Sequence, residues 1–97
     1  MSAFLLATIN VKDPAKLQEY LGKVQQLGVN YGAKRLAKGK AVRAINGEAV
    51  QQDMAIVVEF PDTERLHSLF DSDEYQELIP IREAGKSMVL SSHQMLE

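Results

Sequence analysis

The sequence predicts a single α+β domain, residues 1–97, in which helices cover one face of a four-stranded antiparallel sheet. Two observations predict this class. Apolar runs of strand length alternate with segments whose apolar residues recur every three or four positions, in the order β-α-β-β-α-β. The length of 97 residues and a composition of 45% hydrophobic and 25% charged residues are those of one globular domain.

The first strand and the first helix have the clearest signals. Residues 4–11 are apolar, partly β-branched and free of glycine and proline, which is typical of a buried strand. Asp13 and Pro14 predict a helix start, because aspartate accepts hydrogen bonds from free amides and proline fits the first helical position. One apolar stripe follows, made of Leu17, Tyr20, Leu21, Val24 and Leu27. Gly28 is expected to end this helix.

The segment 31–46 allows two interpretations. Either Gly39 marks a tight hairpin, or the segment is one long strand that is bent by a bulge at Gly39. We prefer the bent strand, because Asn46-Gly47 is a stronger signal for a chain reversal. Residues 54–60 then form the clearest strand of the chain.

Residues 61–85 predict two short helical segments. A Pro-Asp-Thr sequence ends the preceding strand and starts the first of them. Ser72 caps the second, and two acidic residues follow it at the positive end of the helix dipole. Pro80 is expected to kink this helix and Gly85 to end it. A last strand is expected at 88–95.

This order of elements makes a ferredoxin-like sandwich with two crossover helices on one face of the sheet. The other face would then expose Leu, Ile, Val and Met side chains to water over a large area, which is unfavourable. Two identical sheets that pair face to face about a two-fold axis would bury these side chains. We therefore expect a homodimer, in the form of a dimeric α/β barrel.

Composition excludes several classes of function. There is no cysteine, hence no disulfide and no cysteine-based zinc site, and the two histidines are too far apart to suggest a metal site. No metal and no other cofactor is expected. The apolar run 3–7 is too short to span a membrane and has no basic leader, so we expect a cytoplasmic protein without a membrane partner.

Charge is distributed unevenly along the chain. Residues 20–47 contain six basic and no acidic residues, whereas residues 48–83 contain ten acidic and two basic ones. A basic stretch can attract a polyanion. The acidic half and the isoelectric point of about 5.7 would however repel phosphate groups. Nucleic-acid binding is therefore not expected, and attraction between opposite charges within a dimer is favoured.

A set of short motifs occurs in a fixed order. They are Asp13-Pro14 followed by Tyr20, Tyr31-Gly32, Gly39, Gly47, Glu59-Phe60-Pro61, and Ser72-x-x-Tyr75-x6-Arg82. Together they resemble the domain-of-unknown-function family 1330 over nearly the whole chain. The resemblance implies membership of the dimeric α/β-barrel superfamily and no established reaction. That superfamily includes cofactor-free monooxygenases and isomerases, so the fold alone does not define a mechanism.

The chain departs from the family pattern at one place. Many members carry an aromatic pair before the Ser-x-x-Tyr motif, where this chain has Phe70-Asp71. If that pair lines a pocket, the resemblance implies a different ligand here.

Five polar residues on otherwise apolar elements are the candidate ligand-binding residues. Arg82 follows Tyr75 by two helical turns, so both side chains point to similar sides. Arg82 can hold a carboxylate, with the Tyr75 hydroxyl as a second donor and Glu59 to orient the arginine. Asn10 and Tyr20 complete the set. The alternative is a structural ion pair that joins the second helix to the sheet. No catalytic residue can be assigned.

Three further residues have weaker signals. His67 and His93 are the only groups that titrate near neutral pH by default; His67 is expected at the surface, and His93 near the C-terminal end of the last strand. Arg35 has small neighbours two positions away on each side, and the favoured interpretation is that it lies flat and reaches water.

Two functions thus stay open. The protein binds or converts a small acidic or carbonyl-bearing molecule without a metal, or it is a non-catalytic homodimeric assembly or interaction protein. Whether it is an enzyme is left undecided.

Overall fold

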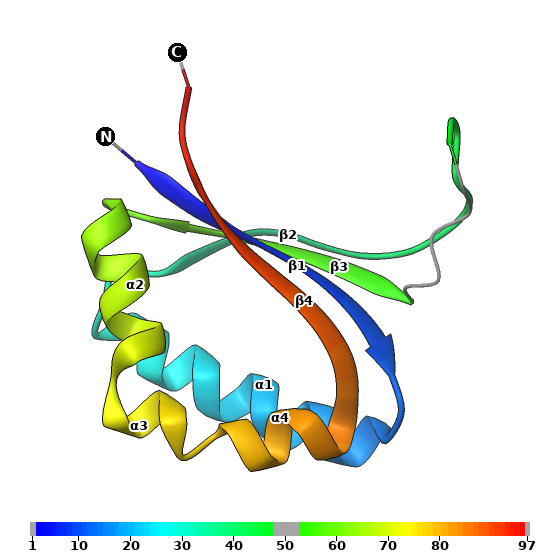
Figure 1. Ribbon diagram of the computed structural model, residues 1–97, viewed down its shortest axis with the longest axis horizontal. Helices are drawn as coiled ribbons and strands as arrows, with labels where there is room; N and C mark the ends of the chain where they lie inside the picture. The colour runs from blue at the N-terminus through cyan, green and yellow to red at the C-terminus, as the bar shows by residue number, and fades with distance from the viewer. Residues whose placement is uncertain (1, 48–52, 97) are drawn as a thin grey trace.

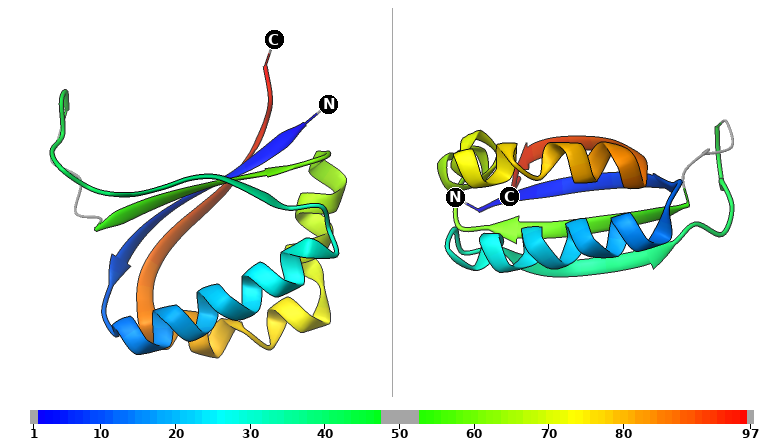
Figure 2. Two further views of the ribbon diagram at one scale, coloured as in Figure 1. Left: turned by 180° about the vertical axis from the view of Figure 1, so that it is seen from behind. Right: turned by 90° about the horizontal axis from the view of Figure 1, so that it is seen from below.

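The computed structural model describes residues 2–47 and 53–96 and has the expected ferredoxin-like fold (Figure 1). The elements are β1 (Ala3–Val11), α1 (Pro14–Val29), β2 (Lys34–Lys40), β3 (Met54–Phe60), α2 (Thr63–Asp71), α3 (Asp73–Gln76), α4 (Ile79–Gly85) and β4 (Lys86–Gln94). The four strands form one antiparallel sheet in the order β2-β3-β1-β4. All four helices lie on the same side of this sheet (Figures 1 and 2). The predicted fold class is confirmed.

The core lies between the sheet and the helices. Side chains alternate between the two faces of a strand, so Ala3, Ala7 and Ile9 of β1 face the helices and are buried. Ile56 and Phe60 of β3 join them from the next strand. The helices contribute the buried side chains of Leu17, Tyr20, Leu66, Leu69, Tyr75 and Leu78. The apolar spacing of the sequence therefore identifies this face correctly.

Helix α1 begins as predicted and ends later than predicted. The Asp13 carboxylate accepts hydrogen bonds from the amides of Ala15, at 3.1 Å, and Lys16, at 3.3 Å. The helix runs past Gly28 to Val29, so the expectation that Gly28 ends it is wrong. Gly28 is buried, and a Cβ atom there would lie 3.0 Å from the Cβ of Ala33.

The turn after α1 depends on a different glycine. Gly32 has a φ of +76°, a conformation that only glycine adopts at little cost. The chain reverses there and enters β2. Gly28 is therefore needed for its small size, and Gly32 for its backbone conformation.

Strand β2 is continuous through Gly39, which pairs with Ala55 of β3. The expected hairpin or bulge at Gly39 is not there. The irregularity lies instead between Arg35 and Ala37, where Leu36 is the extra residue of a β-bulge. Gly47 in the following connection has a φ of +87°. Residues 48–52 lie outside the described part of the chain, and so does the complete reversal predicted at Asn46-Gly47.

The helical segments after β3 follow their capping signals. Asp62 accepts from the amide of Arg65 at 2.8 Å, and the Ser72 hydroxyl accepts from the amide of Tyr75 at 3.2 Å. The kink expected at Pro80 is instead a complete break between α3 and α4, before the proline. Pro80 lies in the first turn of α4, where its missing amide hydrogen is not needed.

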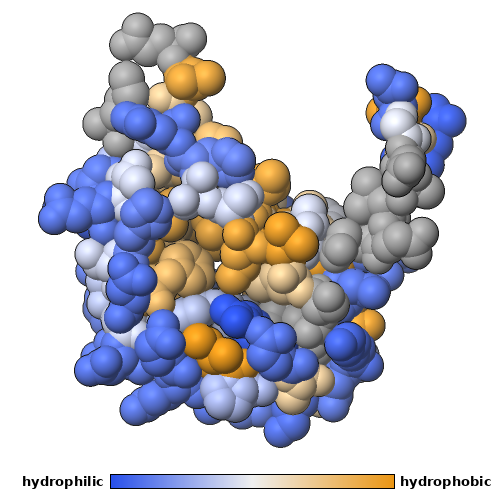
Figure 3. Space-filling model, in the orientation of Figure 1, coloured by the Kyte–Doolittle hydropathy of each residue, from blue (hydrophilic) through white to orange (hydrophobic). Residues whose placement is uncertain are grey.

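The sheet face opposite the helices, here called the open face, is only partly apolar. Its apolar residues are Phe4, Leu6, Val57 and Val89, whose positions in the ladders alternate with those that face the helices. The isoleucine and methionine side chains of the strands face the helices or lie at the sheet ends, so the expectation for those two residue types is wrong. Figure 3 shows apolar side chains at the floor of a hollow on this side of the molecule.

Candidate functional site

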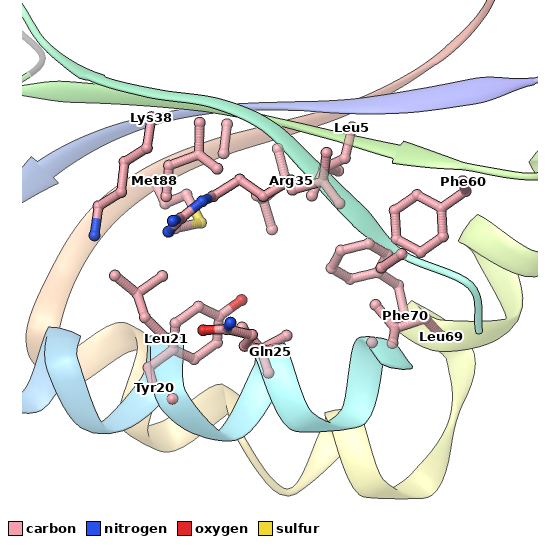
Figure 4. Close-up of a pocket in the computed structure, with 18 of the residues that line it drawn as sticks. Leu5, Tyr20, Leu21, Gln25, Arg35, Lys38, Phe60, Leu69, Phe70 and Met88 are labelled. Carbon is pink, nitrogen blue, oxygen red and sulfur yellow. The ribbon is translucent and has the colours of Figure 1, made fainter. Parts of the chain in front are cut away.

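A cavity of about 340 Å³ lies between α1 and the helix-facing side of the sheet (Figure 4). Its lining is mostly apolar and comes from both layers. The sheet contributes Leu5, Ala7, Ile56, Val58, Met88 and Leu90, and α1 contributes Tyr20, Leu21 and Val24. This volume is within the range of pockets that hold small molecules, about 300–1,000 Å³.

Small residues keep the space open. Ala7, Gly22, Gly28 and Ala33 all line the cavity, two of them from α1. A Cβ atom at Gly22 would meet no heavy atom within 4 Å. Gly22 thus leaves free space at the cavity wall that a larger side chain would fill.

Two cationic side chains, Arg35 and Lys38, border the cavity on the β2 side (Figure 4). Residues three apart on a regular strand point to opposite faces. The bulge at Leu36 adds one residue, so Arg35 pairs with Val58 and Lys38 with Ile56, both on the helix-facing side. Within residues 2–47 and 53–96, neither cation forms an ion pair or a side-chain hydrogen bond.

The cavity has two chemically different ends. Phe60, Leu69 and Phe70 lie together at one end, and the charged groups of Arg35 and Lys38 lie toward the other (Figure 4). Both cations are exposed, whereas Phe60 and Leu69 are buried. The cavity therefore has a buried apolar end and an exposed cationic mouth.

Tyr20 connects the cavity wall to a buried chain of polar groups. Its hydroxyl lies 2.8 Å from the hydroxyl of Tyr75, and their rings meet edge to face. Nη1 of Arg82 donates to the Tyr75 hydroxyl at 2.9 Å, and the guanidinium lies 5.8 Å from the centre of the Tyr75 ring. Arg82 also donates from Nη2 to the carboxylate of Glu83, at 2.7 Å.

Burial and hydrogen bonding change the pKa values of Tyr20 and Arg82. It raises the pKa of the Tyr20 hydroxyl far above its usual value, and the neighbouring Tyr75 raises that pKa further. Burial acts to lower the pKa of Arg82, but the hydrogen bonds to Glu83 and Tyr75 outweigh it and the pKa is raised. Tyr20 is therefore a neutral hydroxyl at pH 7, as tyrosine ordinarily is, and remains one well above pH 10, suited to donate or accept a hydrogen bond.

The structure brings together three of the five residues that the sequence singles out. Tyr20, Tyr75 and Arg82 form one hydrogen-bonded chain, and of the five Tyr20 lines the cavity. Asn10 and Glu59 lie on the open face, on the other side of the sheet. Glu83 is the carboxylate that contacts Arg82, not Glu59.

The sequence pattern does not indicate that Arg35 and Lys38 lie side by side. Their spacing predicts opposite faces, and the bulge at Leu36 that reverses this has no glycine to signal it. Phe70 of the Phe70-Asp71 pair lines the cavity, whereas Asp71 is exposed.

The two histidines lie away from the cavity lining. His67 is 2.9 Å from the Ser92 hydroxyl, and His93 stacks on Phe4 with ring centres 4.9 Å apart. Both are exposed, as predicted for His67. In the described residues no group of three or more His, Asp or Glu side chains is placed to hold a metal ion. None of the helices described is both long and apolar enough to cross a bilayer.

The strand order, the helices on one face and the cavity between the layers define a ferredoxin-like α+β protein with an internal pocket. Comparison with protein families then identifies the family. The model of the domain of unknown function DUF1330 matches residues 2–92, and the chain belongs to this family. None of the curated proteins compared with the chain matches it.

Solved structures share the fold at low sequence identity. A protein of unknown function from Rhodopseudomonas palustris has a TM-score of 0.83 at 15% identity, over 99% of this chain and 83% of that one. A dimeric ferredoxin-like protein of unknown function from Jannaschia sp. CCS1 has 0.74 at 10%, over 98% and 100%. SnoaB, a cofactor-independent oxygenase from Streptomyces nogalater, has 0.71 at 5%, over 99% and 94%. At these identities the likeness shows the fold alone.

Proposed function

We propose that the protein binds a small organic acid in the cavity between α1 and the sheet. The observation that carries this proposal is the pair of cations, Arg35 and Lys38, at the mouth of a mostly apolar space. The apolar body of the ligand would lie toward Phe60 and Phe70, and its acidic group would lie at the two cations.

The energetics of such a complex follow from the two ends of the cavity. Each CH₂ group that leaves water for the apolar end contributes about 0.8 kcal/mol. The planar guanidinium of Arg35 can donate two parallel hydrogen bonds to a carboxylate, and Lys38 adds a second positive charge. Both cations lack an acidic partner among the described residues, so a ligand would not have to break an existing ion pair.

Tyr20 is a buried polar group in the cavity wall, and its position supports a binding role. Like any tyrosine it is protonated at neutral pH, and burial raises its pKa so that it stays protonated in more alkaline solution. A protonated hydroxyl can orient a ligand oxygen but cannot accept a proton as a general base. Binding is accordingly the function that these side chains support best.

Removal of either cation tests the proposal. With 4-phenylbutanoate as the probe, we expect Arg35→Ala and Lys38→Ala each to raise the Kd about tenfold in calorimetry, since a hydrogen bond to a charged group contributes about 1.5–3 kcal/mol. The matched control is Lys34→Ala. It removes one charge from the same strand, but Lys34 pairs with Glu59 on the open face, so its Kd should stay within twofold of wild type.

Two further comparisons separate the charge from the cavity. The neutral amide of the same acid should bind more weakly than the acid and be insensitive to the loss of Arg35. Gly22→Leu should weaken both ligands, because its side chain enters open space in the cavity wall. Equal binding of the acid to wild type and to the Arg35→Ala, Lys38→Ala double variant would overturn the proposal.

The proposal extends to a homodimer formed through the open face. Phe4, Leu6, Val57 and Val89 lie on that face without a covering helix, and Val89 is 60% exposed. Three of the solved neighbours are described as dimeric. A non-catalytic assembly function is favoured by this observation, and it would stand alone if the cavity binds no ligand.

A further inference from the structure

The segment 41–47 leaves the body of the molecule after β2. At its start, a backbone hydrogen bond from the Ala41 amide to the Asp53 carbonyl, at 2.9 Å, joins it to the residue before β3. Beyond that point the segment, here called the arm, rises on the side of the sheet away from the helices (Figures 1 and 2). Val42 is 93% exposed and Ile45 is 88% exposed.

The arm is apolar and basic at the same time. Arg43 lies between the two exposed apolar side chains, and Lys40 precedes them. Within the described part of the chain, neither Lys40 nor Arg43 forms an ion pair. An isolated exposed valine is ordinary. Two large apolar side chains together on a projecting segment indicate a surface that is buried against a partner.

The chemistry of the partner can be found in the same chain. The segment 63–85 presents exposed carboxylates at Glu64, Asp71, Asp73, Glu74, Glu77 and Glu83. The arm of one protomer cannot contact its own acidic helices, because they lie on the opposite side of its sheet (Figure 1). The basic side chains of the arm would therefore meet these carboxylates only in a second copy.

The length of the arm suits that second copy. Two sheets that pack face to face are about 10 Å apart. Seven extended residues span at most about 23 Å. The bends at residues 45–47 make the arm shorter than this maximum, but an arm that rises beside the open face can still pass the edge of a partner's sheet toward the partner's helical layer.

We infer that residues 41–47 clasp a second copy of this chain, with Val42 and Ile45 buried against it and Arg43 directed at its acidic helices. This inference rests on the homodimer proposed above. It adds an interface that the paired sheets do not include.

Sedimentation velocity over a dilution series tests the inference. The Val42→Asp, Ile45→Asp double variant should raise the dimer Kd at least tenfold. Val29→Asp, at another exposed apolar position on α1, should leave it within twofold of wild type. Arg43→Glu should also raise the Kd, and more at low salt than at high salt, whereas Lys12→Glu in the β1–α1 connection should not.

The outcomes separate the arm from the paired sheets. A dimer that persists unchanged in the arm variants, but dissociates in Leu6→Asp, overturns the clasp and retains the sheet interface. A wild-type monomer at all concentrations overturns both. Circular dichroism melting of each variant checks the fold, which should be unchanged because the arm side chains are exposed in the monomer.

Discussion

Tyr20 belongs to two parts of the molecule at once. Its ring lines the cavity, and its hydroxyl is bonded to Tyr75, which in turn accepts from Arg82. Tyr20 and Tyr75 are 3% and 2% exposed, so both hydroxyls are satisfied inside the protein rather than by bulk water. Loss of such a group costs stability whether or not a ligand binds.

Alkaline unfolding should report on this hydroxyl. An unfolded tyrosine has a pKa of about 10, and burial raises the pKa of Tyr20 above that value in the folded protein. As the pH rises past 10 the unfolded chain releases this proton first, so stability is full below pH 10 and then falls by up to about 1.4 kcal/mol per pH unit.

Tyr20→Phe isolates that contribution. The variant should lose about 1 kcal/mol at pH 7 with the hydrogen bond, yet its stability should fall less steeply above pH 10 in urea titrations. Tyr31→Phe, which removes a hydroxyl from a partly buried tyrosine, is the control and should keep the wild-type slope. Identical slopes in the two variants would contradict the assignment to Tyr20.

The connection from α1 to β2 positions the strand that carries both cations. Gly32 has a φ of +76°, and a Cβ atom there would lie 2.8 Å from Cγ of Pro61. Gly32→Ala is therefore expected to destabilise the protein by about 1–2 kcal/mol or more, from the left-handed backbone alone. Chemical denaturation measures the change.

Gly39→Ala provides the comparison within β2. No heavy atom lies within 4 Å of a Cβ at this position, and alanine in a strand interior is favoured over glycine by about 0.5–1 kcal/mol. We expect no loss of stability. If the two alanine variants were equally stable, the turn at Gly32 would not need its positive φ.

The proposed homodimer depends on the apolar side chains of the open face. Leu6 stands on β1 between Val57 of β3 and Ser91 of β4, near the middle of that face. Leu6→Asp places a charge there, and we expect a dimer that is stable at micromolar concentration to become a monomer. Thr63→Asp, on the helical side, should remain dimeric. Light scattering gives the mass, and a wild-type monomer would refute the proposed assembly.

Local signals in the chain were sufficient for most of the architecture. Period-two and period-3.6 spacing, together with caps at Asp13 and Ser72, predict the elements because these interactions involve residues close in sequence. The hydrogen-bonded series Tyr20–Tyr75–Arg82 was predicted in part for the same reason. Tyr75 and Arg82 lie in one helical region, so their spacing places both side chains on similar sides.

The tertiary structure alone decided the cavity and the residues at its mouth. A bulge at Leu36 places Arg35 and Lys38 on the same face, and it depends on pairing with β3, a strand distant in the sequence. Glu59 and Arg82 are separated by the sheet itself, which no local pattern encodes. Sequence by itself determined which side chains are apolar and where the helices and strands start. The register between distant strands decided that Arg35 and Lys38 lie together at the cavity. The physical reason is that a single extra residue in a strand moves the following side chains to the other face.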